Sequence, residues 1–126
     1  MPAAYDMATY LAAQGHGTVG TDIIVGAMPD GADSCVAVYD WGGAAWDKAI
    51  GHERPLVQAR VRSATYAAGL TKCYDIAKEL HKLTNETINT HLYKYVAVIV
   101  PPRFETPDRN DRCEFSITFE IIKEVG

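Results

Sequence analysis

Alternating apolar and polar side chains mark segments of the chain as half-buried strands. In residues 56–62, Val57, Ala59 and Val61 share one side of an extended chain, and polar side chains occupy the other side. Residues 114–122 repeat the pattern, with Phe or Ile at each odd position from 115 to 121. Both segments are therefore predicted to pack one face against a core.

Three further segments are predicted as strands from their apolar character. Residues 23–27 end before a Pro-Asp-Gly turn, and residues 92–100 end at a Pro-Pro pair that is expected to stop the strand. Residues 35–39 are apolar without interruption, which indicates a strand buried on both faces.

Helical periodicity appears in two places. Residues 65–83 carry an apolar stripe at helical spacing, with Ser63 or Thr65 as candidate N-caps and basic residues in the last turn. The stripe consists of Tyr66, Leu70, Cys73, Ala77 and Leu80. Residues 5–14 are predicted as a shorter helix that ends at a glycine.

This order of elements predicts an α+β fold, with a single antiparallel or mixed β-sheet and two α-helices packed on one face. We expect one domain over residues 1–126, with loops at residues 41–54 and 103–112. The other face of the sheet is expected to be solvated, or to form a wet subunit interface. Its charged residues would be Arg60, Arg62, Glu114 and Glu120.

Composition narrows the possible partners. The net charge is -4, and such a domain has no general attraction to nucleic acid or to an anionic membrane. The three cysteines, Cys35, Cys73 and Cys113, are well separated, the N-terminus lacks a basic start, and the longest apolar run is too short to span a bilayer. We therefore expect a soluble protein of a reducing cytosol.

No motif in the sequence predicts catalysis, a metal or a cofactor. Residues 15–20 spell G-x-G-x-x-G, but a helix precedes them and a strand follows, which is the reverse of a dinucleotide site. The four histidines have no metal-ligand spacing. Cys113 borders a charged loop where a lowered thiol pKa is conceivable, yet no local signature supports a nucleophile.

The two long connecting segments of the predicted fold contain residues that are typical of protein contacts. Trp41 and Trp46 lie in a Gly- and Ala-rich stretch, where they either cover the end of the core or form protein contacts. Residues 101–112 are rich in proline and charge and are longer than a hairpin needs. Both stretches are candidate contact surfaces.

Taken in order, the segments resemble the small minor capsid proteins of long-tailed bacteriophages that belong to the tail-terminator group. The likeness covers nearly the whole chain and has no single specific motif. It is carried by residues 12–26, Met28-Pro29-Asp30, residues 35–40 with Gly42-Gly43, residues 55–62, and Arg109, Asp111 and Arg112 ahead of residues 114–119.

The resemblance implies a structural virion protein made in the host bacterial cytoplasm, with no enzyme activity and no cofactor. Such proteins form a ring, commonly of six subunits, that docks on the tail tube, stops its polymerisation and meets the head-completion proteins. DNA would pass through the ring without sequence-specific binding, and no membrane is involved. The alternatives are a head-completion or connector protein of the neck, a small cytosolic enzyme using Cys113, or an adaptor that binds a peptide along an edge strand.

The surface segments together give a set of candidate interface residues. The set is Trp41, Trp46, Arg60, Arg62, Arg103, Asp108, Arg109, Asp111 and Arg112.

Overall fold

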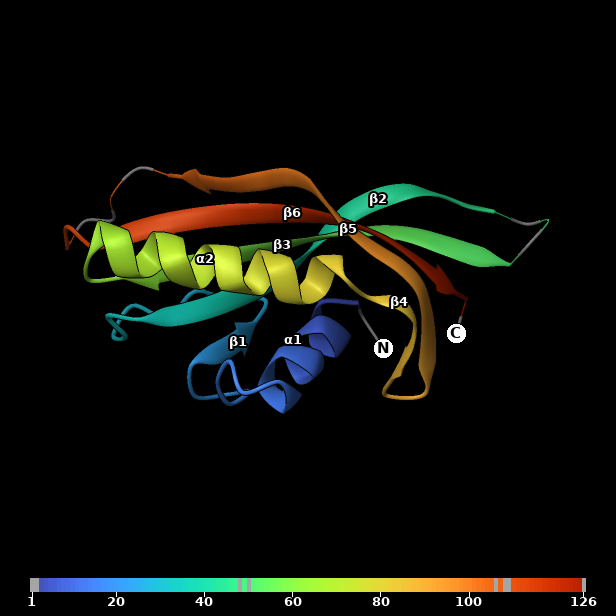
Figure 1. Cartoon of the computed structure of the whole chain (residues 1–126), viewed down its shortest axis with the longest axis horizontal. Helices are drawn as coiled ribbons and strands as arrows, with labels where there is room; N and C mark the ends of the chain where they lie inside the picture. The colour runs from blue at the N-terminus through green and yellow to red at the C-terminus, as the bar shows by residue number, and fades with distance from the viewer. Residues whose placement is uncertain (1–2, 48, 50, 106, 108–109, 126) are drawn as a thin grey trace.

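The computed structural model describes residues 3–47, 49, 51–105, 107 and 110–125 (Figure 1). The elements within these residues are α1 (Ala3–Ala13), β1 (Ile23–Val25), β2 (Cys35–Asp47), β3 (His52–Ser63), α2 (Tyr66–His81), β4 (Thr84–Ile88), β5 (His91–Phe104) and β6 (Cys113–Glu124).

The strands of the described residues form one six-stranded sheet in the order β1-β2-β3-β6-β5-β4. β1 and β2 run parallel, and the other neighbouring pairs are antiparallel. The two alternating segments of the sequence are the central neighbours β3 and β6, where Val57 lies opposite Phe119 and Val61 opposite Phe115. The prediction of an α+β fold with a single sheet is thus confirmed, and the sheet is mixed.

One hydrophobic core joins both helices to the strands. Met7 and Leu11 of α1 and Ile76 and Leu80 of α2 are completely buried in the same cluster as the odd-numbered residues 57–61 of β3 and 115–121 of β6. α1 packs mainly on β1 and β2 and also touches β3, β4 and α2, and α2 packs mainly on β3, β5 and β6. The continuous burial from Cys35 to Val38 was also predicted correctly.

The start of α2 matches the expectation, and so does most of its apolar stripe: Cys73, Ala77 and Leu80 are buried, and Leu70 packs against the core. Thr65 is the N-cap, and its hydroxyl accepts a hydrogen bond from the Ala68 amide at 3.3 Å. Tyr66, predicted to lie in the core, is 52% exposed, and Ile76 is buried on the inner face. Gly69 makes this possible, since a Cβ there would lie 2.5 Å from the Phe115 ring.

The predicted loop at residues 41–54 is wrong, because β2 continues to Asp47 and β3 begins at His52. These residues form a long hairpin that extends to the right in Figure 1, and we call its residues 40–55 the arm. Register shifts in β2 follow Asp40 and Ala44 and disturb the alternation that would mark a strand.

Two further boundaries differ from the prediction. The polar segment Thr84–Ile88 is a strand, β4, which no pattern in the sequence indicated. β5 does not stop at its proline pair but runs on to Phe104. β4 pairs with β5 between His91 and Tyr95, and within the described residues the later part of β5 has no outer neighbour. Proline is tolerated on such an edge because no ladder donor is needed there.

A buried carboxylate fastens α1 to the turn between β4 and β5. Asp6 is completely buried and accepts hydrogen bonds from the side-chain amide Nδ2 of Asn89 at 2.8 Å and from the Tyr93 hydroxyl. The His91 Nδ1 lies 2.8 Å from the same carboxylate. Burial, together with this hydrogen bond to Asp6, raises the pKa of Tyr93 and keeps its phenol protonated.

Asp6→Ala should therefore destabilise the protein by about 2–4 kcal/mol, because it leaves buried donors without an acceptor. Urea unfolding measures the change, and Asp75→Ala on the exposed side of α2 is the matched control, with an expected change within about 0.5 kcal/mol. Equal effects of the two substitutions would contradict the role given to Asp6.

Candidate subunit interface

The arm presents the chain's two tryptophans to solvent. Trp41 is 51% exposed and Trp46 is 63% exposed, and every residue from 41 to 46 is exposed. The idea that these rings cover the end of the core is therefore wrong. Exposed tryptophans in one segment are typical of a protein contact surface.

The shape of the arm depends on Gly43. This residue has φ +143° and lies opposite Pro55. A Cβ at this position would lie 2.7 Å from the Pro55 Cα and closer still to the Arg54 carbonyl oxygen. A side chain there would push β2 away from β3, so the glycine is required by the close approach of the two strands.

A second apolar surface, which no pattern in the sequence indicates, lies between α2 and β5. A hollow of about 230 Å³ there is lined by Tyr74, Ala77, Lys78, His81, Val98, Pro101 and Pro102. The His81 ring nitrogen Nδ1 accepts a hydrogen bond from the Val98 amide at 3.0 Å, which joins the end of α2 to the edge of β5.

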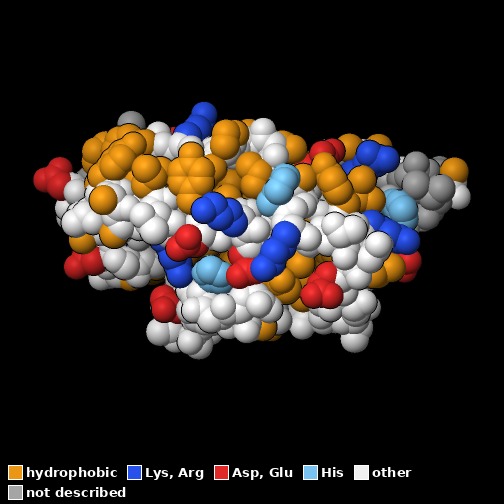
Figure 2. All heavy atoms as spheres, in the orientation of Figure 1, with side chains coloured by type: hydrophobic (Ala, Val, Ile, Leu, Met, Phe, Trp, Pro, Cys, Tyr) orange, Lys and Arg blue, Asp and Glu red, His pale blue; other side chains and the backbone are white. Residues whose placement is uncertain are grey.

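Aromatic rings continue this surface toward the start of α2. The ring of Tyr66 packs on Phe104 and Phe115, with centroids 5.3 and 5.1 Å apart. Figure 2 shows hydrophobic side chains gathered over this end of α2 and β5, at the upper left. We call the surface the apolar strip; its residues are Tyr66, Tyr74, Ala77, Val98, Pro101, Pro102 and Phe104.

Arg62 is not solvated, which corrects the expectation for the outer face of the sheet. Its side chain is 5% exposed, and its Nη2 lies 3.0 Å from Glu114 Oε2. The same guanidinium donates to the carbonyl oxygens of Pro29 and Ala32. Arg112, 7% exposed, also donates to the Ala32 carbonyl, at 2.9 Å. Both arginines thus hold the loop between β1 and β2, because they donate hydrogen bonds to its backbone carbonyl oxygens.

The other predicted interface residues lie at the surface or outside the described residues. Arg60 is partly exposed and lies 3.6 Å from Glu114. Arg103 is exposed and pairs with Glu105 at 3.0 Å. Asp111 is exposed, with φ +60°. Asp108 and Arg109 fall outside the part of the chain that the structure describes.

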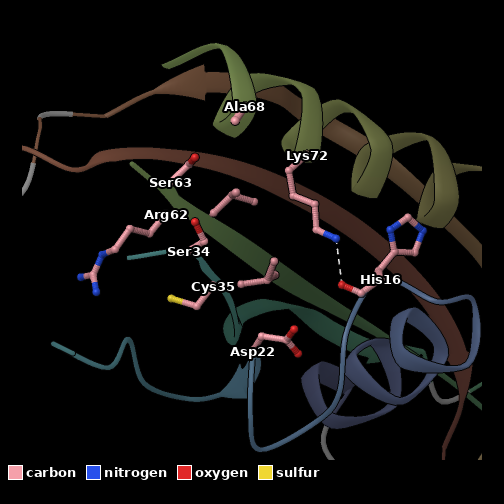
Figure 3. Close-up of a pocket in the computed structure, with 10 residues that line it drawn as sticks. His16, Asp22, Ser34, Cys35, Arg62, Ser63, Ala68 and Lys72 are labelled. Carbon is pink, nitrogen blue, oxygen red and sulfur yellow. Dashed lines mark hydrogen bonds between the residues drawn. The ribbon is translucent and has the colours of Figure 1, made fainter. Parts of the chain in front are cut away.

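A more polar hollow of about 270 Å³ lies beside Cys35, between β2, β3 and α2 (Figure 3). The His16 ring contacts Glu79 at 3.0 Å, and in Figure 3 it points away from the Cys35 sulfur. Lys72 donates to the His16 carbonyl at 2.8 Å. Burial raises the pKa of Cys35, so this thiol stays protonated. The hollow therefore contains no paired nucleophile and base among its described residues.

The glycine-rich segment beside this hollow is a turn fixed by its own backbone. The Thr18 carbonyl accepts hydrogen bonds from the amides of residues 21, 22 and 23. The Asp22 carboxylate accepts from the Thr18 amide at 2.5 Å, and a Cβ on Gly17 would lie 2.6 Å from that carboxylate. α1 precedes the turn and β1 follows it, as the sequence predicted, so the backbone amides serve the turn itself.

The described residues carry no metal cluster and no disulfide. No group of His, Cys, Asp and Glu side chains among the described residues could hold a metal ion. No helix in that part of the chain is long and apolar enough to cross a membrane. The three cysteines are unpaired, and burial raises the pKa of Cys73 to about 12.

Comparison with known proteins gives one family. A family model described as bacteriophage tail terminator protein matches residues 10–125. Among solved structures, a chain of a structure titled "Virion of native gene transfer agent (GTA) particle" is similar, with a TM-score of 0.66 and 15% identity over 84% of this chain and 81% of that chain. At this identity the likeness shows a shared fold. No curated protein matches the sequence.

The arginine arrangement makes a prediction about two neighbouring positions of β3. Arg62→Met should destabilise the protein by about 3–5 kcal/mol, because the largely buried carboxylate of Glu114 would lose its closest cationic partner. Arg60→Met should cost less than about 1 kcal/mol, because that pair is partly exposed. Urea unfolding of both variants would contradict the assignment if the costs were equal or reversed.

Thiol labelling tests whether any cysteine is activated. At pH 8, a thiol with a pKa of about 12 is ionised in roughly one molecule in 10⁴, so buried Cys73 should label only on unfolding. Cys113 is partly exposed and should label no faster than glutathione in the native protein. Much faster labelling of Cys113 would favour the enzyme alternative.

Proposed function

This chain belongs to the bacteriophage tail terminator family, and we propose that it works as one subunit of a ring at the head-proximal end of the tail tube. It is a structural protein of the phage virion. In the proposed role, copies of the chain close on the end of the tube, stop its polymerisation and offer a surface to the head-completion or connector proteins.

The observation that carries the proposal is the pair of unlike apolar surfaces on one subunit. A closed ring needs a heterologous contact, in which two different patches of each copy meet around the circle. The arm with Trp41 and Trp46 and the apolar strip are two such patches. A ring of this kind also has two unlike faces, which suits a protein that meets the tube on one side and the head on the other.

The charged candidates are proposed to act around these patches. We take both helices to cover the same face of the sheet, so that the other face, with Arg60, is available to a neighbour. Arg103, Asp108, Arg109 and Asp111 are proposed to contact the tube or the next subunit. Arg62 and Arg112 leave this set, because their buried side chains hold the loop between β1 and β2.

The remaining parts of the proposal concern the number of subunits in the ring, the passage of DNA through it and the question of catalysis. Six copies are proposed for the ring. The net charge of -4 suits a pore through which DNA passes without adhering. No catalytic role is proposed, because the described hollow near Cys35 lacks a paired nucleophile and base.

Particles that lack this protein test the role. Electron micrographs should show overlong tails, or tails not joined to heads, because uncapped tubes keep growing. Supplying the wild-type chain should restore tails of normal length. Tails of normal length that stay separate from the heads would instead indicate a head-completion or connector protein. Normal infectious particles would contradict both roles.

A further inference from the structure

We propose that the arm of one subunit packs its tryptophans on the apolar strip of the next subunit, and that this contact closes the ring. The inference rests on the proposed ring and names its contact surfaces. It commits to a second copy of this chain as the occupant of the strip.

The β2 side of the arm is exposed to solvent along its described residues 41–46. Beyond Val57 toward its tip, β3 has no fully buried residue in the described part, and residues 41–46 of β2 are all exposed. β6 supports β3 in the arm, because His52 and Glu53 pair with Glu124 and Lys123, whereas residues 41–46 of β2 have no further strand beside them among the described residues. With each ring more than half exposed, the two tryptophans leave roughly 200 Å² uncovered, about a quarter of what one partner buries in a specific interface. They can therefore anchor a contact that neighbouring residues complete.

The strip has the complementary chemistry. Its hollow is lined by apolar side chains with Lys78 and His81 beside them, and no acidic residue lines it. The exposed β2 part of the arm, residues 41–46, consists of Trp, Gly and Ala only and carries no charge. Apolar surface would thus meet apolar surface.

The positions of the two surfaces fit a head-to-tail contact. In Figure 1 the arm lies at one end of the long axis, and the start of α2 and the last part of β5 lie at the other end. An arm therefore cannot reach the strip of its own chain, whereas it can reach that of a neighbour placed end to end. Contacts of this type form rings when the rotation between copies closes.

The outer edge of β5 favours side-chain packing over the addition of a strand. The Val96 amide donates to the Leu83 carbonyl at 3.2 Å, and the Val98 amide donates to His81. Pro101 and Pro102 have no amide hydrogen at all. An incoming strand would find few donors along this edge, so a partner must bind through the side chains of the strip.

Photocrosslinking in assembled tails tests the contact directly. The photoreactive residue p-benzoylphenylalanine is placed at position 46, and at position 5 on α1 as a control. Position 46 should crosslink to residues 66–82 or 96–104 of a second copy, seen as a dimer on a gel and mapped by mass spectrometry. Crosslinks to the tube protein, to a connector or to another arm would overturn the inference, as would the absence of a dimer in assembled tails.

Complementation between two variants separates this contact from the proposed function. The arm variant carries Trp41→Asp and Trp46→Asp, and the strip variant carries Tyr74→Asp and Pro101→Asp; circular dichroism confirms that each folds. At concentrations where the wild-type chain assembles, each variant alone should be monomeric by native mass spectrometry. A 1:1 mixture should give a heterodimer, because one intact arm and one intact strip remain. If no heterodimer forms, or if the arm variant still gives tails of normal length, the contact is wrong while the terminator role stands.

Discussion

The strands of this sheet are longer than the core that supports them. Both helices and inner residues of β3 and β6 share one cluster, and along β3 its last member toward the arm is Val57. β2 and β3 nevertheless continue for several residues, and they carry both tryptophans of the chain into solvent. Apolar surface in water is unfavourable in proportion to its area, so the exposed tryptophans favour a contact that covers them. The proposed assembly would remove this surface from water.

Buried charges hold the irregular segments in place and leave the contact surfaces to apolar side chains. Asp6 fastens α1 to the turn at Asn89, while Arg62 and Arg112 hold the loop that leads into β2. Such groups are costly to bury unless they are fully paired, and once they are paired they fix a single arrangement. Arg62 and Arg112, which seemed suited to partner binding, therefore act within the monomer. The surfaces proposed for partners are the arm, the apolar strip and the exposed charged residues around them.

The sequence predicts elements well where one face is buried and poorly where neither face is. β3, β6 and α2 each have a regular apolar period because they line the core, and each was predicted within a few residues. The arm was taken for a loop because its glycines and bulges interrupt the period of two. β4 is polar and largely exposed, so it carries no such period. The burial of Arg62 could not be predicted, since its partners Pro29 and Ala32 are distant in the sequence. The apolar strip was missed because Tyr66 was placed in the core and β5 was ended at its prolines.

The solvent access of Trp41 and Trp46 tests the central claim most directly, because the chain has no other tryptophan. The chain can be labelled with 5-hydroxytryptophan, which is excited selectively in the presence of unlabelled partners, and its fluorescence quenched with acrylamide before and after assembly on tail tubes. Burial of the arm predicts strong quenching of the monomer and a clear loss of quenching in the assembled tail. Equal quenching in both states would show that the arm stays in water and would contradict the account.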